Sequence, residues 1–455
     1  MNTLPVQFEE QMKKILSNEA DKFFQSLQTE SPVSIRLNPG KVKSINEIFT
    51  DQQIIPINWC KNAYYLNNRP IFTLDPYFHG GAYYVQEASS MFLHHILKQI
   101  MPDKPLKVLD LCAAPGGKST LIASHLPPDS LLVSNEVIRS RASILKENII
   151  KWGQDNIIVT GNDPADFRKL EGAFDIIIVD APCSGEGLFR KDPDAINEWS
   201  ENNLRLCSER QQRILSDIWG SLKPGGFLIY STCTYNRGEN EKILEWLQHQ
   251  FDVHSVQIEH PFNAITTADS TMHCYHFYPH KTIGEGFFIG VVQKQDGKEF
   301  TFRKNKKQGN TPTLSLSSDV RKFILQPEKY AAYQTENTIG VLPSRYVDFI
   351  AQLDDTLRIL YKGCEIAETY NHKLKLLPAS ALWQGLNKTN CTLYEVDRTT
   401  ALTFLKKEDI PPTGAIGDWL LISYQHIALG WCKNLGNRLN NYYPKEWRIR
   451  MKINN

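Results

Sequence analysis

The sequence lacks a strong net charge, a cysteine framework and a long apolar run. Its 455 residues carry a net charge of only +1, so a polyanion would have to bind local basic patches. The 9 cysteines are odd in number and include no C-x-x-C pair, which argues against a disulfide framework and zinc-finger sites. No apolar run approaches the ~20 residues of a membrane span. We therefore expect a reduced protein that works without a membrane and without a bound metal.

The first residues, MNTLPVQFEEQMKKI, also lack the pattern of a signal peptide. Acidic residues stand where such a peptide needs a basic end followed by an apolar block. Hydrophobic residues make up 41% of the chain and charged residues 22%, as in ordinary globular proteins with room for two or three domains. These features predict a cytoplasmic protein, and nothing in them calls for an obligate protein partner or for more than a monomer.

Strand-like and helix-like segments alternate from Leu106 onward. The pattern predicts strands over 107–113, 131–136, 156–163, 174–182 and 227–233, and helices over 118–126, 138–153 and 202–222. Such alternation is typical of βαβ units in a doubly wound parallel sheet, hence an α/β fold. A KPGG turn at 223–226 precedes the fifth strand, and a last apolar segment, 284–294, would close the sheet.

The pattern also suggests a division into domains. Residues 1–100 are expected to form a lobe of short helices and turns, 101–295 the α/β core, and 296–318 a basic linker without periodicity. Residues 319–455 form an accessory region, in which 356–368 and 417–433 alternate like strands of one small mixed or barrel-like domain.

A loop of small residues, LDLCAAPGGKST, follows the first expected strand. A phosphate-binding P-loop would need glycine at position 112, where this chain has Cys112. A nucleoside cofactor fits better, because Glu136, Asp163 and Asp180 stand at the ends of the three following strands, where acids can bind ribose and base. The alternative is that these acids only cap helices. The absence of G-x-G-x-x-G disfavours a nucleotide dehydrogenase.

Two cysteines stand just past the ends of strands, in FDIIIVDAPCSGEGLF and GGFLIYSTCTYNRGENE. They are Cys183 and Cys233, and both should face the crevice at the carboxyl ends of a parallel sheet. Polar residues surround both, which favours a reactive thiol, although a free cysteine is more often a packed apolar side chain. We expect packing for the other cysteines outside the glycine loop: Cys60, Cys207, Cys274, Cys364, Cys391 and Cys432.

These motifs resemble those of the RNA cytosine-C5 methyltransferases of the Sun and nucleolar-protein family. LDLCAAPGGKS, DAPCSGEG and STCTYNRGENE carry the likeness, together with SIRLNPG and GGAYYVQEASSM upstream and GEGFF downstream. The rest of the chain is similar to the bacterial ribosomal-RNA subgroup, RsmF, whose members have a C-terminal PUA-like domain. The resemblance implies a Rossmann-like methyltransferase core, an N-terminal RNA-binding lobe and the cofactor S-adenosylmethionine.

The resemblance also implies roles for individual residues. Cys233 would be the nucleophile that attacks carbon 6 of cytosine, Cys183 would assist product release, and Asp180 would contact the ring at N3 and the amino group. The cofactor would be bound by Cys112, Ala113, Ala114, Pro115, Gly116, Gly117, Lys118, Glu136, Asp163 and Asp180. DNA cytosine methyltransferases use the other cysteine as nucleophile, and residue chemistry alone does not choose between the two.

The implied partner is RNA, either 16S ribosomal RNA or the small ribosomal subunit, with transfer RNA as the open alternative. A base must be single-stranded or flipped out to reach a cleft cysteine. Basic segments with aromatic neighbours could hold the RNA: Arg139, Arg141, Lys146, Arg190, Lys191, the run 298–307, and the tail 442–452 with Tyr442, Tyr443 and Trp447.

Several alternatives stay open on the sequence alone. Each basic segment could be an ordinary solvated surface. The aromatic residues Tyr77, Phe78, Tyr83 and Tyr84 fit a core better than a base platform, and His79 and His280 are expected to be structural or RNA-facing. The chain could also be a P-loop-like NTPase, or an RNA-binding assembly factor without catalysis in which Cys233 is only packed.

Overall fold

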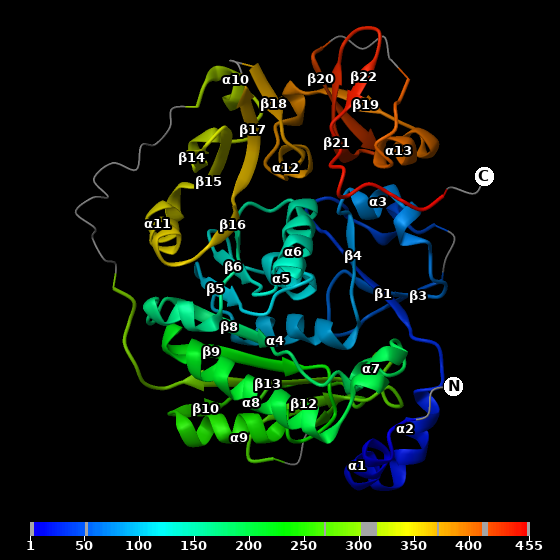
Figure 1. Ribbon diagram of the computed structural model, residues 1–455, viewed down its shortest axis with the longest axis vertical. Helices are drawn as coiled ribbons and strands as arrows, with labels where there is room; N and C mark the ends of the chain where they lie inside the picture. Colours follow the sequence, from blue (N-terminus) through cyan, green and yellow to red (C-terminus); the bar gives the residue numbers. More distant parts are fainter. Residues whose placement is uncertain are drawn as a thin grey trace.

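A ten-stranded sheet forms the centre of the computed structural model, which describes residues 4–50, 53–267, 270–301, 316–370, 373–411 and 417–452 (Figure 1). The strand order is β11-β12-β13-β9-β8-β5-β6-β7-β16, and β10 also pairs with β13. The five central strands are parallel: β5 Lys107–Asp110, β6 Leu131–Asn135, β7 Ile157–Thr160, β8 Phe174–Asp180 and β9 Leu222–Thr232. The predicted doubly wound α/β fold is confirmed.

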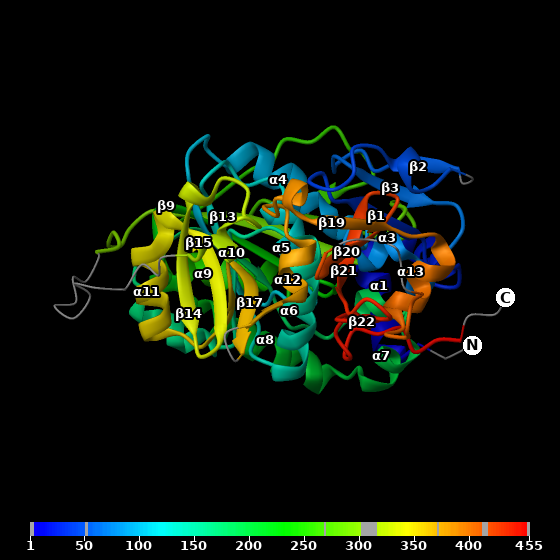
Figure 2. The same ribbon diagram turned by 90° about the horizontal axis from the view of Figure 1, so that it is seen from above.

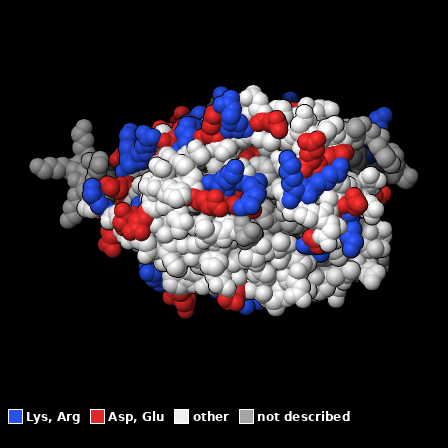
Figure 3. Space-filling model, turned by 90° about the horizontal axis from the view of Figure 1, so that it is seen from below, with Lys and Arg blue, Asp and Glu red and all other residues white. Residues whose placement is uncertain are grey.

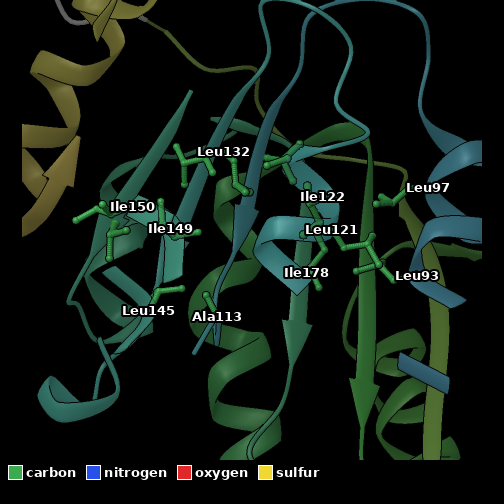
Figure 4. Close-up of a cluster of buried hydrophobic side chains, with 14 of the residues drawn as sticks. Leu93, Leu97, Ala113, Leu121, Ile122, Leu132, Leu145, Ile149, Ile150 and Ile178 are labelled. Atoms are coloured by element: carbon green, nitrogen blue, oxygen red, sulfur yellow. The ribbon is translucent and has the colours of Figure 1, made fainter. Parts of the chain in front are cut away.

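Helices cover both faces of this sheet because its strands are apolar on both sides. On one face, Val108 and Leu132 pack against α4 Phe92–Ile100, α5 Gly117–Ala123 and α6 Arg139–Trp152, as Figure 4 shows for Leu93, Leu121 and Leu145. On the other face, Leu109 and Val133 share a cluster with α8 Glu201–Ile218 and α9 Glu241–Gln250. Buried parallel strands of this kind give short continuous apolar runs.

The edges of the sheet differ from the sequence prediction. The segment expected to close it is β13 Phe287–Lys294, but this strand lies inside the sheet and runs antiparallel to β9. Three short strands lie beyond it: β10 Val253–Ser255, β11 Thr266–Thr267 and β12 Cys274–Phe277. The expected KPGG turn belongs to β9, whose register with β8 shifts there. Short strands with little periodicity explain the error.

The N-terminal residues contain a sheet that the sequence prediction missed. Its order is β2-β3-β1-β4, from β1 Val33–Leu37, β2 Ile54–Pro56, β3 Ala63–Leu66 and β4 Tyr83–Val85. Short helices accompany it: α1 Val6–Leu16, α2 Ala20–Ser26 and α3 Pro76–His79. Strands of three to five residues are too short for a clear alternation of apolar and polar side chains.

The SIRLNPGK segment joins this sheet to the end of α6. The Asn38 side chain donates hydrogen bonds to the carbonyls of Gly81 (2.9 Å) and Trp152 (2.8 Å). The ammonium group of Lys41 donates to the carbonyls of Gly80 (2.8 Å) and Lys151 (2.6 Å). The last carbonyls of a helix lack partners within it, so these side chains satisfy them and fix the N-terminal sheet against α6.

The C-terminal region forms two separate small sheets, not one (Figure 2). One contains β14 Tyr330–Thr335, β15 Thr338–Pro343, β17 Cys364–Tyr370 and β18 Lys373–Leu376, and the other β19 Thr392–Glu395, β20 Trp419–Tyr424, β21 Ile427–Asn434 and β22 Leu439–Asn441. The helices are α10 Ser318–Arg321, α11 Val347–Thr356, α12 Pro378–Leu382 and α13 Arg398–Leu405.

The strand β16 Ile359–Lys362 leaves this region and pairs antiparallel with β7 of the central sheet. The expectation that 356–368 and 417–433 belong to one small domain was therefore wrong. Most of the basic linker, 302–315, lies outside the described residues, and the predicted domain limits stay a prediction. None of the described helices combines the length and the hydropathy needed to cross a membrane.

Candidate active site

A cavity of about 300 Å³ opens where β5, β8 and β9 end. Parallel strands present their carboxyl ends on one side of a sheet, and ligands of such folds bind there. The side chains in its wall come from five segments of the chain: Tyr84, Gln86, Glu87, Cys112, Pro115, Lys118, Asp180, Leu188, Lys191, Cys233, Glu285 and Phe287. The cavity therefore brings the glycine loop together with Asp180 and Cys233, as the sequence predicts.

Two side chains of α6 hold the glycine loop. The guanidinium group of Arg141 donates to the carbonyl of Ala114 (2.8 Å), and the side-chain amide of Asn148 donates to that of Pro115 (2.8 Å). Gly116 has a φ of 113°, which glycine adopts more readily than other residues. Arg141, a predicted RNA contact, thus supports the loop from α6.

Arg36 supports the next turn of this segment from the N-terminal sheet. Its buried guanidinium group donates to the hydroxyl of Thr120 (2.6 Å) and to the carbonyl of Gly117 (3.3 Å). It also donates to the side chain of Gln86 (3.1 Å) and lies 4.6 Å from the ring centre of Trp152. The SIRLNPG motif by itself does not predict this contact, because the contact spans more than eighty residues of chain.

Asp110, which the sequence analysis did not single out, lies under the loop with no exposed surface. One carboxyl oxygen accepts a hydrogen bond from Ser119 (2.6 Å), and the other has no partner among the described residues. Burial raises the pKa of Asp110 to about 7, although the bond from Ser119 works in the opposite direction. Its place directly before the loop was the only signal in the sequence.

The two other predicted cofactor acids do not line the cavity. Glu136 is buried, accepts a hydrogen bond from the main-chain N–H of Ile138 (2.9 Å) and lies 3.7 Å from Arg141. Asp163 accepts from the N–H of Ala165 at the start of a short helical turn and pairs with Arg213 at 3.2 Å. Both therefore make local contacts of the kind that the capping alternative describes, and their cofactor role stays a prediction.

Asp180 lies between the glycine loop and β9. One carboxylate oxygen pairs with the ammonium group of Lys118 at 2.8 Å, and the other accepts a hydrogen bond from Ser231 (2.7 Å). Burial works against the charge of Lys118, but the neighbouring Asp180 carboxylate raises its pKa above the usual value. About a third of the Asp180 side chain stays exposed to a ligand in the cavity (34%).

The two thiols lie together, although 50 residues separate them in the chain. The distance between the sulfur atoms of Cys183 and Cys233 is 3.2 Å. Cys233 lines the cavity, whereas Cys183 is absent from its wall. The hydrogen bond with Cys233 and burial raise the pKa of Cys183 well above its usual value, so Cys183 stays a neutral thiol at neutral pH.

Two predicted RNA contacts are wrong, because their side chains are buried. Arg190 pairs with Glu285 at 2.9 Å, with 5% of its side chain exposed. Tyr443 is 1% exposed and its hydroxyl lies 3.3 Å from Nδ1 of His79. His79 is itself buried, as the structural alternative predicts. By contrast, Lys191 is exposed and lies in the cavity wall.

The face of the molecule seen from below carries charges of both signs (Figure 3). On the face shown in Figure 3, basic and acidic side chains of the described residues lie next to one another, with uncharged surface between them. This agrees with the net charge of +1. Attraction of a polyanion would then depend on single side chains near the cavity, such as Lys191.

The cavity residues fit S-adenosylmethionine. Its amino-acid part needs donors and acceptors at close range, which the loop main chain and the exposed part of the Asp180 carboxylate offer. Tyr84, Pro115 and Phe287 give the wall apolar surface for a nucleoside. Pockets for small molecules commonly combine apolar walls with a few polar groups in this way.

Three family models match the chain. The model described as 16S rRNA methyltransferase RsmB/F matches residues 98–293, and the N-terminal domain of 16S rRNA methyltransferase RsmF matches residues 4–88. The methyltransferase RsmF PUA domain matches residues 391–449, which confirms the predicted PUA-like domain.

The chain is also similar to named relatives along its whole length. It is 30% identical to the ribosomal RNA small subunit methyltransferase F of Enterobacter sp. (strain 638), over 97% of this chain and 95% of the relative. The protein of the same name from Erwinia tasmaniensis is 30% identical over 97% of this chain and 96% of its own.

Solved structures agree with these matches. A methyltransferase homologue from Pyrococcus horikoshii is 27% identical, with a TM-score of 0.54 over 63% of this chain and 94% of that one. The fold also matches NSun6 of the same organism, solved with SFG, an analogue of S-adenosylmethionine (19% identity, TM-score 0.56, 65% and 99% covered). The chain therefore belongs to the RsmB/F family of S-adenosylmethionine-dependent 16S rRNA methyltransferases.

Proposed function

We propose that this protein methylates carbon 5 of a cytidine in 16S ribosomal RNA through a covalent bond between Cys233 and the base. The observation that carries the proposal is the pair of sulfur atoms 3.2 Å apart, one of them in the wall of the cofactor cavity beside Asp180. Cysteines that serve only as packed apolar side chains have no reason to meet at the ends of two separate strands. Methylation at this carbon, by contrast, needs a nucleophile, which a thiol can supply.

The chemistry explains why a thiolate is needed. Carbon 5 of cytosine is a poor nucleophile until the Cys233 sulfur adds to carbon 6, which forms an S–C bond and moves electron density onto carbon 5. S-adenosylmethionine supplies, when bound, a methyl group on a positively charged sulfur. After methylation, loss of the carbon-5 proton restores the ring double bond and expels the Cys233 thiolate.

The surroundings of each thiol support this division of roles. Cys233 lines the cavity and can reach a base there, whereas Cys183 is not part of the cavity wall and stays a neutral thiol. An S–H group at 3.2 Å can donate a hydrogen bond to the Cys233 sulfur, which stabilises the thiolate both before attack and when it leaves. Asp180, fixed by Lys118, would contact the N3 and amino edge of the base.

The test measures methyl transfer and covalent adducts in wild type, Cys233→Ala and Cys183→Ala. Each protein is incubated with radiolabelled S-adenosylmethionine and with unmodified 16S rRNA, assembled small subunits or unmodified tRNA. We expect transfer to 16S rRNA by wild type, no transfer by Cys233→Ala, and a denaturant-resistant protein–RNA adduct that accumulates in Cys183→Ala.

Other outcomes have definite meanings. An adduct that persists in Cys233→Ala and is lost in Cys183→Ala would make Cys183 the nucleophile. Methylation of tRNA alone would replace the proposed substrate. Binding of RNA without transfer to any of the three substrates would favour an assembly factor without catalysis.

A further inference from the structure

Two buried carboxylates connect the loops that carry the thiols. Glu186 stands three residues after Cys183, and Glu239 stands six residues after Cys233; both side chains have no exposed surface. Each carboxylate reaches across to the loop of the other cysteine. We call Glu186 and Glu239 the carboxylate pair.

Glu186 binds the segment that follows Cys233. Its Oε2 atom accepts three hydrogen bonds, from the hydroxyl of Thr234 (2.5 Å) and from the main-chain N–H groups of Tyr235 (2.8 Å) and Asn236 (2.9 Å). A carboxylate that accepts several main-chain bonds fixes the backbone as well as the side chains. The segment directly after the proposed nucleophile therefore cannot move without breaking these bonds.

Glu239 makes the reverse connection. Its Oε2 atom accepts from the main-chain N–H of Ser184 (3.0 Å), the residue next to Cys183, and from the side-chain amide of Gln211 (2.9 Å) on α8. Its Oε1 atom accepts from the side-chain amide of Asn236 (2.7 Å). Burial raises the pKa of Glu239, while the bonds from Ser184 and Asn236 act in the opposite direction.

All donors to the two carboxylates are neutral: a hydroxyl group, main-chain and side-chain amides, and the indole N–H of Trp199. A buried charge without enough hydrogen bonds is strongly unfavourable, so both loops must stay in place for the pair to be tolerated. A main-chain bond from Gly187 N–H to the carbonyl of Cys233 (2.9 Å) joins the same two loops. Apart from Gln211 and Trp199, the residues that make these contacts lie within six positions of Cys183 or Cys233 in the chain.

The N-terminal helix α1 supports the pair from outside. The Gln11 side chain donates to Oε1 of Glu186 (3.2 Å), which also accepts from the indole N–H of Trp199 (3.0 Å). Phe8 packs edge-on against Phe189, with ring centres 4.9 Å apart. Three segments far apart in the chain thus converge on one carboxylate.

We propose that Glu186 and Glu239 are positioning residues, which hold the Cys183 and Cys233 loops at the spacing that methyl transfer needs. The inference rests on the proposed function for its catalytic consequence. Its structural content, the fixed spacing of the two thiols, does not depend on any substrate. A shift of about 1 Å in a reacting group can lower the rate about 100-fold, so methyl transfer requires that the spacing of the two thiols stays fixed.

The test uses Glu186→Gln and Glu239→Gln, with Glu209→Gln as the matched control. A glutamine keeps the shape, but in either orientation its NH₂ group faces donors that the carboxylate accepted. We expect kcat to fall about 10-fold to 100-fold in both pair variants, while KM for S-adenosylmethionine changes little. Glu209 is exposed on α8 beside Arg205, and its variant should match wild type.

A second measurement needs neither RNA nor cofactor. Iodoacetamide labelling followed by peptide mapping should show Cys183, a partly exposed thiol, reacting about tenfold faster in the pair variants, because local opening of its loop exposes more of it. Cys432, buried in the C-terminal sheet, should stay protected. Faster Cys183 labelling would support the inference even if the proposed cytidine chemistry failed.

Two results would overturn the inference. One is an unchanged kcat together with labelling of Cys183 at the wild-type rate. The other is labelling of Cys183 and Cys432 together, which would show that the carboxylates only stabilise the whole fold. If a glutamine variant does not fold, Gln11→Ala removes a single bond to Glu186 and must show the same changes in smaller degree.

Discussion

Replacement of Arg36 by lysine tests whether the N-terminal sheet controls the cofactor loop. Arg36 is 1% exposed and donates to four side-chain or main-chain oxygens, on Gln86, Gly117 and Thr120. Burial lowers its pKa to about 10, so it stays charged at neutral pH. Lysine keeps this charge but loses the planar group that donates in several directions and stacks on Trp152.

The expected loss follows from these contacts. Removing a hydrogen bond from a charged group costs about 1.5–3 kcal/mol, and a desolvated cation–π contact contributes up to about 2 kcal/mol. Since lysine can retain part of the bonding, we expect Arg36→Lys to lower the free energy of unfolding by about 2–4 kcal/mol. Gly117 lines the cavity, so a displaced loop that loses about 1 kcal/mol of binding would raise the Kd for S-adenosylmethionine about fivefold.

Urea unfolding followed by tryptophan fluorescence measures the first effect, and calorimetric titration with S-adenosylmethionine measures the second. Arg345→Lys is the control, because Arg345 forms an exposed ion pair with Asp129 at 3.1 Å, and such pairs contribute at most about 1 kcal/mol. Equal unfolding free energies and equal Kd values for the two variants would refute the reasoning.

Three further predictions concern other parts of the structure. Gly153→Ala should destabilise the fold by more than about 2 kcal/mol in urea unfolding, since φ is 84° and an added Cβ would lie 2.2 Å from a carbonyl oxygen of α12; Gly220→Ala, with nothing within 4 Å, should change little. Burial lowers the pKa of His79 to about 4, so the unfolded chain binds a proton that the folded chain does not between pH 6.5 and 4. Unfolding free energy should therefore fall on acidification through this window, by up to about 1.4 kcal/mol per pH unit for this group, and His79→Gln should reduce that slope. Lys118→Met removes the cation 2.8 Å from Asp180 and should lower methyl transfer about 10-fold to 100-fold with an unchanged circular dichroism spectrum; normal activity would show that the ion pair has no role in catalysis.

The sequence determined the core and the general place of the site. Apolar strands of four to eleven residues between amphipathic helices require a parallel sheet, and the carboxyl ends of parallel strands meet on one side. An acid and a cysteine at the end of one strand, and a second cysteine at the end of the next, had to come close together. For this reason Asp180, Cys183 and Cys233 could be grouped without a structure.

Only the tertiary structure decided which side chains serve the site and which support it. Glu186, Glu239 and Arg36 look like ordinary charged residues in the sequence, because their partners lie in other segments. Arg190 and Tyr443 look exposed and are buried, since packing against distant elements leaves no local periodicity. Strand order also divides into a part that the sequence predicts and a part that it does not. The sequence pattern predicted the strands β5 to β9. The pairing of β16 with β7 depends on contacts between residues about 200 positions apart, which no local pattern encodes.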